Sequence, residues 1–261
     1  MTQLEADDVR IEEARAGIFV LTIDRPARRN ALNLAIKSRI ATLVEDLDQS
    51  GEARVIVITG GARVFAAGTD LAEMAGLTPT DHVLKRTDRM FTAMRNCATP
   101  LIAAVEGYAL GGGCELAMGC DLIVAAKTAR FGQPEIRVGV IPGAGGTQRM
   151  LRILGKYRAL RLLLTGDQIS AEDAFGAGLI SELTEEGDAL PRALELAASI
   201  VAMPPLAARA ILELVDVGAD VPLPTALLLE RKAFQLLFDT DDQEEGMRAF
   251  LEKRPAEFHA H

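Results

Sequence analysis

Three short, almost purely apolar runs most strongly limit what this chain can fold into: VIVIT at 55–59, LIAAV at 101–105 and LIVAA at 122–126. Such runs are typical of strands covered on both faces, as in a parallel sheet flanked by helices. Apolar residues at helical spacing follow Leu32 and stop at Gly51, and a second helix is predicted over 81–97. Strands that alternate with helices predict an α/β fold.

The two ends of the chain differ from this central pattern. Residues 9–14 and 17–24 alternate apolar and polar side chains, which predicts a half-buried hairpin. After Gly146 the strand signals fade, and the remaining segments have helical patterns. These predicted helices cover 146–154, 156–164, 171–177, 188–202, 205–216, 224–238 and 242–252.

Met203-Pro204-Pro205 marks the weak boundary in this helical half. We therefore expect a core over 1–203 and a helical C-terminal region over 204–261. The C-terminal region has apolar side chains that either bury against other subunits or cover their own core, and the pattern leaves both open. They are Leu227, Leu228, Phe234, Leu237, Phe238 and Phe250.

Charge and composition narrow the class of partner. The chain has 28 Lys plus Arg against 37 Asp plus Glu, and its net charge of -9 opposes binding to nucleic acid. The start, MTQLEADDVR, has no signal-peptide pattern, and acidic residues and glycines interrupt the long apolar stretch over 101–126. We expect a cytoplasmic protein that does not enter a membrane.

Cysteine and histidine give no sign of metal or triad chemistry. Cys97, Cys114 and Cys120 are odd in number and match no zinc spacing, so buried reduced thiols are expected. Two of the three histidines lie within the last three residues of the chain, where chains usually fray. A metal site or a histidine triad is not expected.

Three glycine-rich turns carry the chemical signal: VFAAGTD at 64–70, GYALGGGCE at 107–115 and IPGAGGTQ at 141–148. The third lacks both the dinucleotide spacing and the Walker Lys-Ser/Thr pair, which argues against a nucleotide loop. In the second, a helix that starts near Gly112 presents free N–H groups. A further N–H at Gly68-Thr69 completes a two-donor oxyanion hole, in which one donor is worth roughly 2.7–4 kcal/mol.

Two glutamates follow glycine or proline at expected helix starts. Glu115 and Glu135 both have apolar neighbours in the sequence. Each carboxylate either complements the helix dipole or, with a pKa raised by desolvation, transfers protons near neutral pH. Spacing alone favours the first interpretation for each, and the presence of the pair favours the second.

The ordered blocks of this chain resemble the enoyl-CoA hydratase/isomerase, or crotonase, family. The blocks are LTIDRPARRNAL, FAAGTDLAEM, IAAVEGYALGGGCELAMGCDLIVAA, FGQPEIRVGVIPGAGGTQR and DDQEEGMRAFLEKRP. The resemblance implies a spiral of repeated β-β-α units and a helical C-terminal region that forms trimers, commonly paired into hexamers. It also implies an acyl-CoA thioester substrate and no cofactor beyond the coenzyme A that the substrate carries.

The same resemblance implies roles for particular residues. The N–H groups of Thr69 and Gly112 hold the thioester oxygen, Glu115 deprotonates the water that attacks C3, and Glu135 protonates C2. The family pattern has alanine frequently at Thr69 and a coenzyme A-contacting lysine often at Ala72, and this chain departs from both. The coenzyme A contacts carried over are Ala27, Arg28, Ala31, Gly68, Asp70, Leu71, Phe234, Phe250 and Lys253.

Because both glutamates are present, the resemblance implies reversible hydration of a trans-2-enoyl-CoA to a 3-hydroxyacyl-CoA. Two alternatives remain. One is double-bond isomerisation or other enolate chemistry in the same pocket. The other is a non-catalytic scaffold or RNA-associated paralogue, against which the intact carboxylates and the acidic charge argue.

Overall fold

The computed structural model describes residues 8–259, so most of the acidic start and the final histidine lie outside the described residues. The strands in this part are β1 (Val9–Arg15), β2 (Ile18–Ile23), β3 (Val55–Thr59), β4 (Leu101–Val105), β5 (Tyr108–Leu110), β6 (Leu122–Ala126), β7 (Arg130–Gly132), β8 (Gln168–Ser170) and β9 (Glu182–Thr184).

The α-helices in this part are α1 (Leu34–Ser50), α2 (Leu71–Met74), α3 (Pro79–Leu84), α4 (Arg89–Arg95), α5 (Gly112–Met118), α6 (Gly146–Thr165), α7 (Ala171–Gly176), α8 (Ala189–Val201), α9 (Pro205–Gly218), α10 (Leu223–Leu236) and α11 (Asp241–Glu252). Three short 3-10 helices, η1 (Pro26–Arg28), η2 (Pro134–Val138) and η3 (Leu237–Asp239), complete the secondary structure.

The expected α/β fold is confirmed, and the main sheet has six strands in the order β1-β2-β3-β4-β6-β9. Strands β2, β3, β4, β6 and β9 pair in parallel, while β1 forms the predicted antiparallel hairpin with β2. The three apolar runs are β3, β4 and β6, at the predicted bounds.

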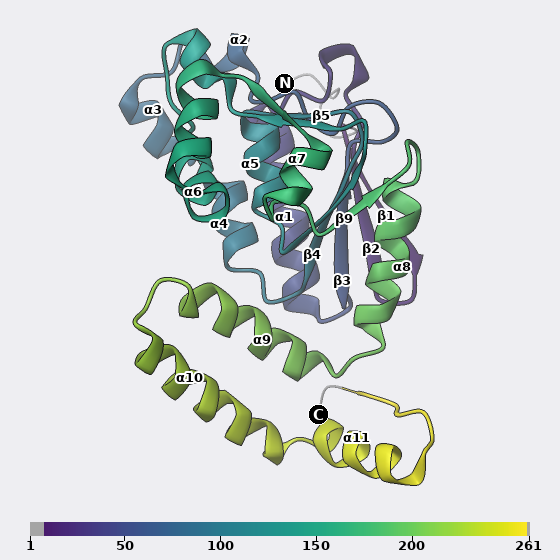
Figure 1. The fold of residues 1–261 in the computed structure, drawn as a ribbon. Helices are drawn as coiled ribbons and strands as arrows, with labels where there is room; N and C mark the ends of the chain where they lie inside the picture. The colour runs from purple at the N-terminus through teal and green to yellow at the C-terminus, as the bar shows by residue number, and fades with distance from the viewer. Residues whose placement is uncertain (1–7, 260–261) are drawn as a thin grey trace.

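Helices cover both faces of this sheet, which explains why its strands need no polar side. Val55 and Val57 of β3 pack with Ala193 and Ala197 of α8 in one apolar cluster. The alternate residues of β3 face the larger core, which α1, α4 and α5 complete. Figure 1 shows α8 and α1 on opposite sides of the strands.

A second, smaller sheet positions the functional loops, and the sequence did not reveal it. Its order is β5-β7-β8, with β5 and β7 parallel. Parallel bridges from Leu32 to Thr69 and from Ala66 to Ala109 extend the layer beyond β5. With these bridge segments included, the chain from β2 to β7 passes back and forth between the large sheet and the small layer, as in the repeated β-β-α units that the resemblance implies.

The predicted elements differ from the structure in two places, and a third prediction, a break near residue 155, is confirmed. The helix predicted over 81–97 is two helices, α3 and α4, because Arg86 between them has a left-handed φ of 46°. Strands β8 and β9 lie after Gly146, where no strand was predicted; each has only three residues, too few for a periodicity. The break predicted near residue 155 is present within α6 as a non-helical Gly155.

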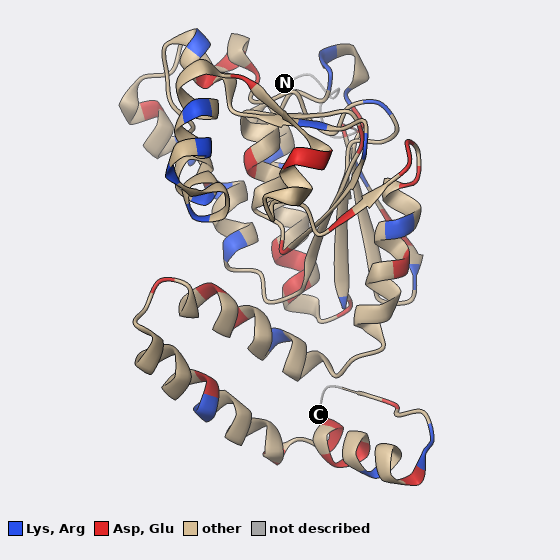
Figure 2. Cartoon of the chain, viewed as in Figure 1, with Lys and Arg blue, Asp and Glu red and all other residues tan. Residues whose placement is uncertain are grey.

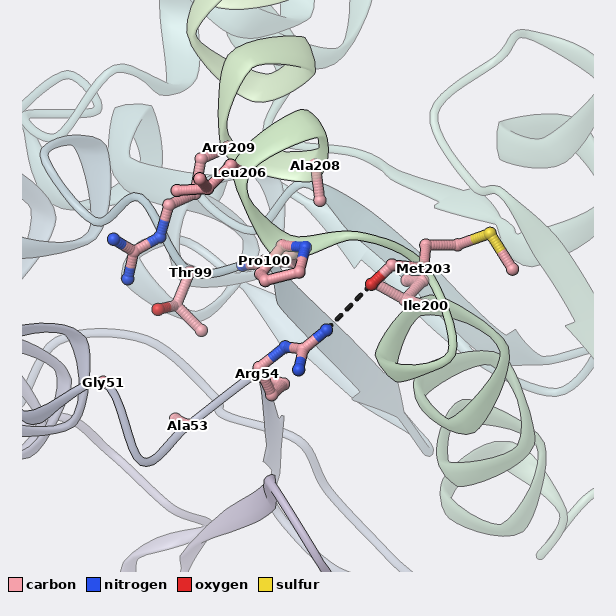
Figure 3. A pocket seen from close by; sticks show the side chains of 11 residues that line it. Gly51, Ala53, Arg54, Thr99, Pro100, Ile200, Met203, Leu206, Ala208 and Arg209 are labelled. Atoms are coloured by element: carbon pink, nitrogen blue, oxygen red, sulfur yellow. Dashed lines mark hydrogen bonds between the residues drawn. The ribbon is translucent and has the colours of Figure 1, made fainter. Parts of the chain in front are cut away.

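The C-terminal helices α9, α10 and α11 lie below the body in Figure 1. Arg54, just before β3, helps to attach them: its Nη2 donates to the carbonyls of Val201 at 3.2 Å and Met203 at 2.8 Å, where α8 ends (Figure 3). A cavity of about 170 Å³ lies beside this contact and has Arg209 of α9 in its wall.

Charges are unevenly distributed over the surface. Figure 2 shows basic residues along α6, whose sequence includes Arg149, Arg152, Lys156, Arg158 and Arg161. Among the described residues no single helix is long and apolar enough to cross a bilayer, and α8 with α9 meets that test only as a pair bent by 111°.

Candidate active site

The three consecutive glycines at 111–113 allow the chain to turn from β5 into α5 where other backbone lies very close. Gly111 has φ 51° and ψ -127°, a conformation that needs glycine. A Cβ on Gly112 would lie 2.7 Å from Thr69 Oγ1, and one on Gly113 would lie 2.1 Å from the Ala66 carbonyl oxygen. Each glycine therefore has a separate steric reason to be glycine.

The opposite strand segment, Ala66 to Thr69, aligns with this turn by register. Ala66 bridges Ala109 in parallel, so Thr69 and Gly112 are each three residues beyond a paired position. Leu32 bonds to the residues on both sides of Thr69, through Leu32 N to Gly68 O at 2.8 Å and Asp70 N to Leu32 O at 3.1 Å. The Thr69 N–H therefore points away from Leu32.

These two turns supply two unused donors. Within residues 8–259 neither the Thr69 N–H nor the Gly112 N–H donates to an oxygen. The Thr69 nitrogen would be 3.3 Å from a Cβ on Gly112, so the two peptide groups are in contact. Two neighbouring N–H groups without a partner, one of them at a helix N-terminus, are the kind of donor pair from which an oxyanion hole is built.

Glu115 lies on the first turn of α5 and is held by the turn at 144–146. Its side chain is buried, and Oε1 accepts hydrogen bonds from Ala144 N at 2.7 Å and Gly146 N at 2.9 Å. Arg149 Nη1 donates to the Ala144 carbonyl at 2.9 Å and so fixes the donor turn. Both bonds go to one oxygen, and no described residue bonds to Oε2.

Glu135 is at the start of η2, three residues beyond Gly132, which pairs with Leu110 of β5. A Cβ on Gly111 would be 2.8 Å from Glu135 Oε1, so this carboxyl borders the glycine turn. Burial, and to a lesser extent the charge of Glu115, raises the pKa of Glu135 to about 7. A carboxyl with this pKa donates and accepts protons near neutrality.

Gln133 connects this carboxyl to the glycine turn. Its side chain is fully buried, and with the amide oriented to satisfy its neighbours the nitrogen is 3.1 Å from each Glu135 oxygen and 3.3 Å from Gly111 O. The amide donates to whichever oxygen is unprotonated and holds the carboxyl in place. The sequence analysis missed Gln133; a polar residue between a buried strand and a proline was the available signal.

The predicted coenzyme A contacts of the N-terminal half gather on two adjoining segments. Ala27 and Arg28 belong to η1, and Ala31 follows it. Gly68, Asp70 and Leu71 lie on the neighbouring segment, joined to the first by the backbone bond from Ala67 N to Arg29 O at 3.1 Å. Leu71 is 50% exposed at this edge.

Arg25 and Asn30, which were not among the predicted site residues, hold these segments together. Arg25 Nη1 donates to Asp70 Oδ2 at 2.7 Å, and this hydrogen bond lowers the pKa of Asp70. Asn30, buried with a left-handed φ of 56°, donates to the carbonyls of Gly60 at 2.8 Å and Val64 at 2.7 Å. Asp70 is thus an ion-pair partner and the N-cap of α2.

Phe234, Phe250 and Lys253 are not near this pocket within one chain. They lie on α10 and at the end of α11, which Figure 1 places at the other end of the molecule from α2. Phe234 is 49% exposed and Phe250 is 84% exposed. Any contact with coenzyme A therefore requires the site of another copy.

The remaining reactive side chains lie outside the pocket or have other roles. All three cysteines are free thiols, and burial raises the pKa of Cys97 to about 12. Among residues 8–259 no group of three or more His, Cys, Asp or Glu side chains is arranged to hold a metal ion.

Comparison with known proteins identifies the family. The model of the enoyl-CoA hydratase/isomerase family matches residues 13–261. The chain belongs to the enoyl-CoA hydratase/isomerase family. A probable enoyl-CoA hydratase of Mycobacterium leprae is 46% identical over 92% of this chain and 94% of its own length. The 2,3-dehydroadipyl-CoA hydratase of Escherichia coli is 43% identical over 92% of this chain and 94% of its own length.

Solved structures of the enoyl-CoA hydratase/isomerase family agree over almost the whole length. An enoyl-CoA hydratase structure from Geobacillus kaustophilus superposes with a TM-score of 0.94 at 41% identity, covering 98% of this chain and 100% of that one. An enoyl-CoA hydratase from Mycobacterium tuberculosis gives a TM-score of 0.89 at 37% identity, covering 97% and 99%. The crotonase fold expected from the sequence is confirmed.

The contact between the two donor turns predicts the effect of one added methyl group. In Gly112→Ala the new Cβ overlaps Thr69 Oγ1 and forces the turns apart, although both N–H groups remain. We expect kcat for an acyl-CoA substrate to fall by roughly 100- to 1,000-fold, as when one oxyanion-hole donor is lost. Gly76→Ala, where no atom lies within 4 Å of the new Cβ, is the matched control and should retain activity. Full activity in Gly112→Ala would refute the close contact.

Proposed function

We propose that this protein is an enoyl-CoA hydratase that adds water reversibly to trans-2-enoyl-CoA thioesters. The observation that carries the proposal is that Thr69, Gly112 and Glu135 each follow closely after one of three adjoining, parallel-paired segments, with Glu115 held by the turn at 144–146. Named hydratases that are 43% and 46% identical over most of the chain support it.

The proposed reaction begins at the thioester carbonyl. The oxygen accepts from the Thr69 and Gly112 N–H groups, which become stronger partners as negative charge develops on it. Glu115, with Oε1 occupied by two backbone donors, offers Oε2 to a water molecule. The water oxygen bonds to C3 while its proton passes to Glu115, and the π electrons move to the carbonyl oxygen as an enolate.

Glu135 completes the proposed addition. Its raised pKa keeps a substantial protonated fraction near neutral pH, and that proton passes to C2 as the enolate collapses. The pair starts with one proton on Glu135 and ends with one on Glu115, so addition consumes water alone. The atoms balance with coenzyme A present only as part of the substrate, and we propose that no metal or redox cofactor takes part.

We also propose that the protein is a homotrimer or a dimer of trimers. The support is the apolar surface of the C-terminal region: Leu236 is 74% exposed, Leu251 is 80% exposed and Val215 is 65% exposed. Exposed apolar area on this scale is typical of an interaction surface. Such an assembly would also bring Phe234, Phe250 and Lys253 toward a neighbouring site.

Replacing either site glutamate by glutamine removes its ability to transfer a proton and should greatly slow hydration. For Glu115→Gln and Glu135→Gln we expect kcat to fall by at least about 100-fold, the lower range for general acid-base catalysis. The decrease in crotonyl-CoA absorbance measures hydration, and 3-enoyl-CoA supplied separately tests for isomerisation. Glu52→Gln, an exposed glutamate, is the control. Undiminished hydration in either site variant would remove the role assigned to that glutamate.

The pKa of Glu135 sets the expected pH profile. The active pair carries one proton, so kcat/KM should fall as pH rises through about 7, where Glu135 loses its proton. Dehydration of the 3-hydroxyacyl-CoA should show the same alkaline limb, because the net reaction releases no proton and the ratio of the two constants does not vary with pH. Initial rates in both directions test this, and profiles that diverge or stay flat through neutrality would contradict it.

Mutation of the C-terminal surface should change assembly. Leu236→Glu places a charge on the apolar face of α10, and we expect the mass measured by light scattering to fall from that of a trimer or hexamer to that of a single chain. Arg158→Gln, on the exposed side of α6, should keep the native mass. A monomeric wild-type protein would overturn the proposed assembly.

A further inference from the structure

A buried lysine lies beside the donor turns and has no role in the reaction described above. Lys37 is in the first turn of α1 and is only 9% exposed. Its Nζ donates to Thr69 Oγ1 at 3.1 Å. Within the described part of the chain this is its one side-chain hydrogen bond, and it forms no ion pair there.

This position is unfavourable for a lysine in two respects. Burial removes water from the ammonium group, which costs free energy unless other groups replace the water. The N-terminal turn of a helix also carries partial positive charge and disfavours a cation. No fold requirement explains a charge here, since a methionine would fill the same space with neither cost.

The partner of Lys37 is Thr69, which supplies one of the two N–H donors of the proposed oxyanion hole. Thr69 Oγ1 is 2.7 Å from where a Cβ on Gly112 would stand, so the hydroxyl lies against the second donor turn. A hydroxyl that accepts from an ammonium keeps its own O–H free to donate, and the cation makes that O–H a stronger donor. Lys37, Thr69 and the bound oxygen can therefore form a chain of hydrogen bonds.

We propose that Lys37 and the Thr69 hydroxyl form a relay that adds a third, charge-assisted donor to the oxyanion hole. Lys37 is then a positioning residue that acts through Thr69, with its positive charge next to the developing enolate. The proposal rests on the acyl-CoA chemistry proposed above and assigns a function to the threonine side chain, which the backbone N–H contact leaves unused.

Burial and two nearby carboxylates act on the pKa of Lys37 in opposite directions, and the net effect is a lowered pKa. Burial lowers the pKa of Lys37, while the carboxylates of Glu115 on α5 and Glu73 on α2 raise it. These are the charged groups that face it. Glu73 is itself fixed to the start of α1, since Oε2 accepts from Leu34 N at 2.7 Å.

Single and double variants test the relay. For Lys37→Met and for Thr69→Ala, which keeps the backbone N–H, we expect kcat for crotonyl-CoA hydration to fall by roughly 10- to 100-fold, with KM changed by no more than about twofold. The double variant should lose little more than either single variant, because the two residues act as one unit. Thr69→Ser keeps the hydroxyl and should retain most of the activity.

The control is Arg39→Met, which removes an exposed positive charge two residues further along α1. It should keep kcat within about twofold of the wild-type value, as expected for a solvated surface charge. Thermal unfolding of every variant shows whether it is folded. If Lys37→Met does not fold, Thr69→Ala and Thr69→Ser decide the proposal on their own.

The pH profile gives a signature that a structural lysine would not. In wild-type protein the alkaline decline of log kcat/KM should steepen where Lys37 loses its proton, and in Lys37→Met this steeper part should disappear. A kcat equal to the wild-type value in Lys37→Met or in Thr69→Ala would overturn the relay. So would a loss in the double variant equal to the product of the two single losses.

Failure of the proposed function is distinguishable from failure of the relay. If the wild-type protein hydrates no enoyl-CoA, bound acetoacetyl-CoA still reports on the oxyanion hole, because its enolate absorbs in the near ultraviolet. The relay predicts a larger enolate fraction in the wild-type complex than in Lys37→Met. Equal fractions at saturation would refute it.

Discussion

The backbone contact between the segment Ala66–Thr69 and the turn Gly111–Gly113 is the constraint on which the rest of the site depends. A side chain at any of the three glycines would meet backbone or side-chain atoms of the opposite segment or of Glu135. The contact exists because the second strand of each unit joins a small sheet of its own. The large sheet and its helices supply the stability that holds this polar contact in place.

The two carboxylates are held differently, and their environments suit different tasks. Glu115 is fixed by hydrogen bonds from two backbone N–H groups, whereas Glu135 lies in a desolvated position with a pKa of about 7. Paired carboxyls with unlike environments are a general basis for separating base and acid roles. The turn that contains Ala144 and Gly146, which lacks a nucleotide-binding pattern, has its function here as a donor to Glu115.

The sequence predicted those parts of the fold that rest on local pattern. Strands β3, β4 and β6 are covered on both faces, and their sequences are therefore almost entirely apolar. The helix after Asn33 ends at Gly51 as expected. Strands β5, β7, β8 and β9 have three residues each, and their pairing depends on partners distant in the sequence, so no window of residues reveals them. The break at Arg86 was missed for a similar reason, since arginine carries no turn signal.

The candidate site divides in the same way. The sequence predicted Gly112, Glu115 and Glu135 as site residues because glycines and glutamates stand out next to apolar strands. Asn30, Arg25, Gln133 and Lys37 act through tertiary contacts, and each looks in the sequence like an ordinary polar or charged residue. The family resemblance supplied the reaction that the residues alone left open, while the Lys37 to Thr69 contact came only from the structure.

The register of the small sheet has one more consequence. Neighbouring strands are about 4.8 Å apart by the geometry of backbone hydrogen bonding. Donors that lie level on two such strands therefore have a separation set by the spacing between the strands, and an oxygen that accepts hydrogen bonds of about 2.9 Å from both fits between them. Side chains around the site can change widely in size or charge without altering the distance between the two donors. Substrate range and reaction type can therefore change while the donor pair stays the same.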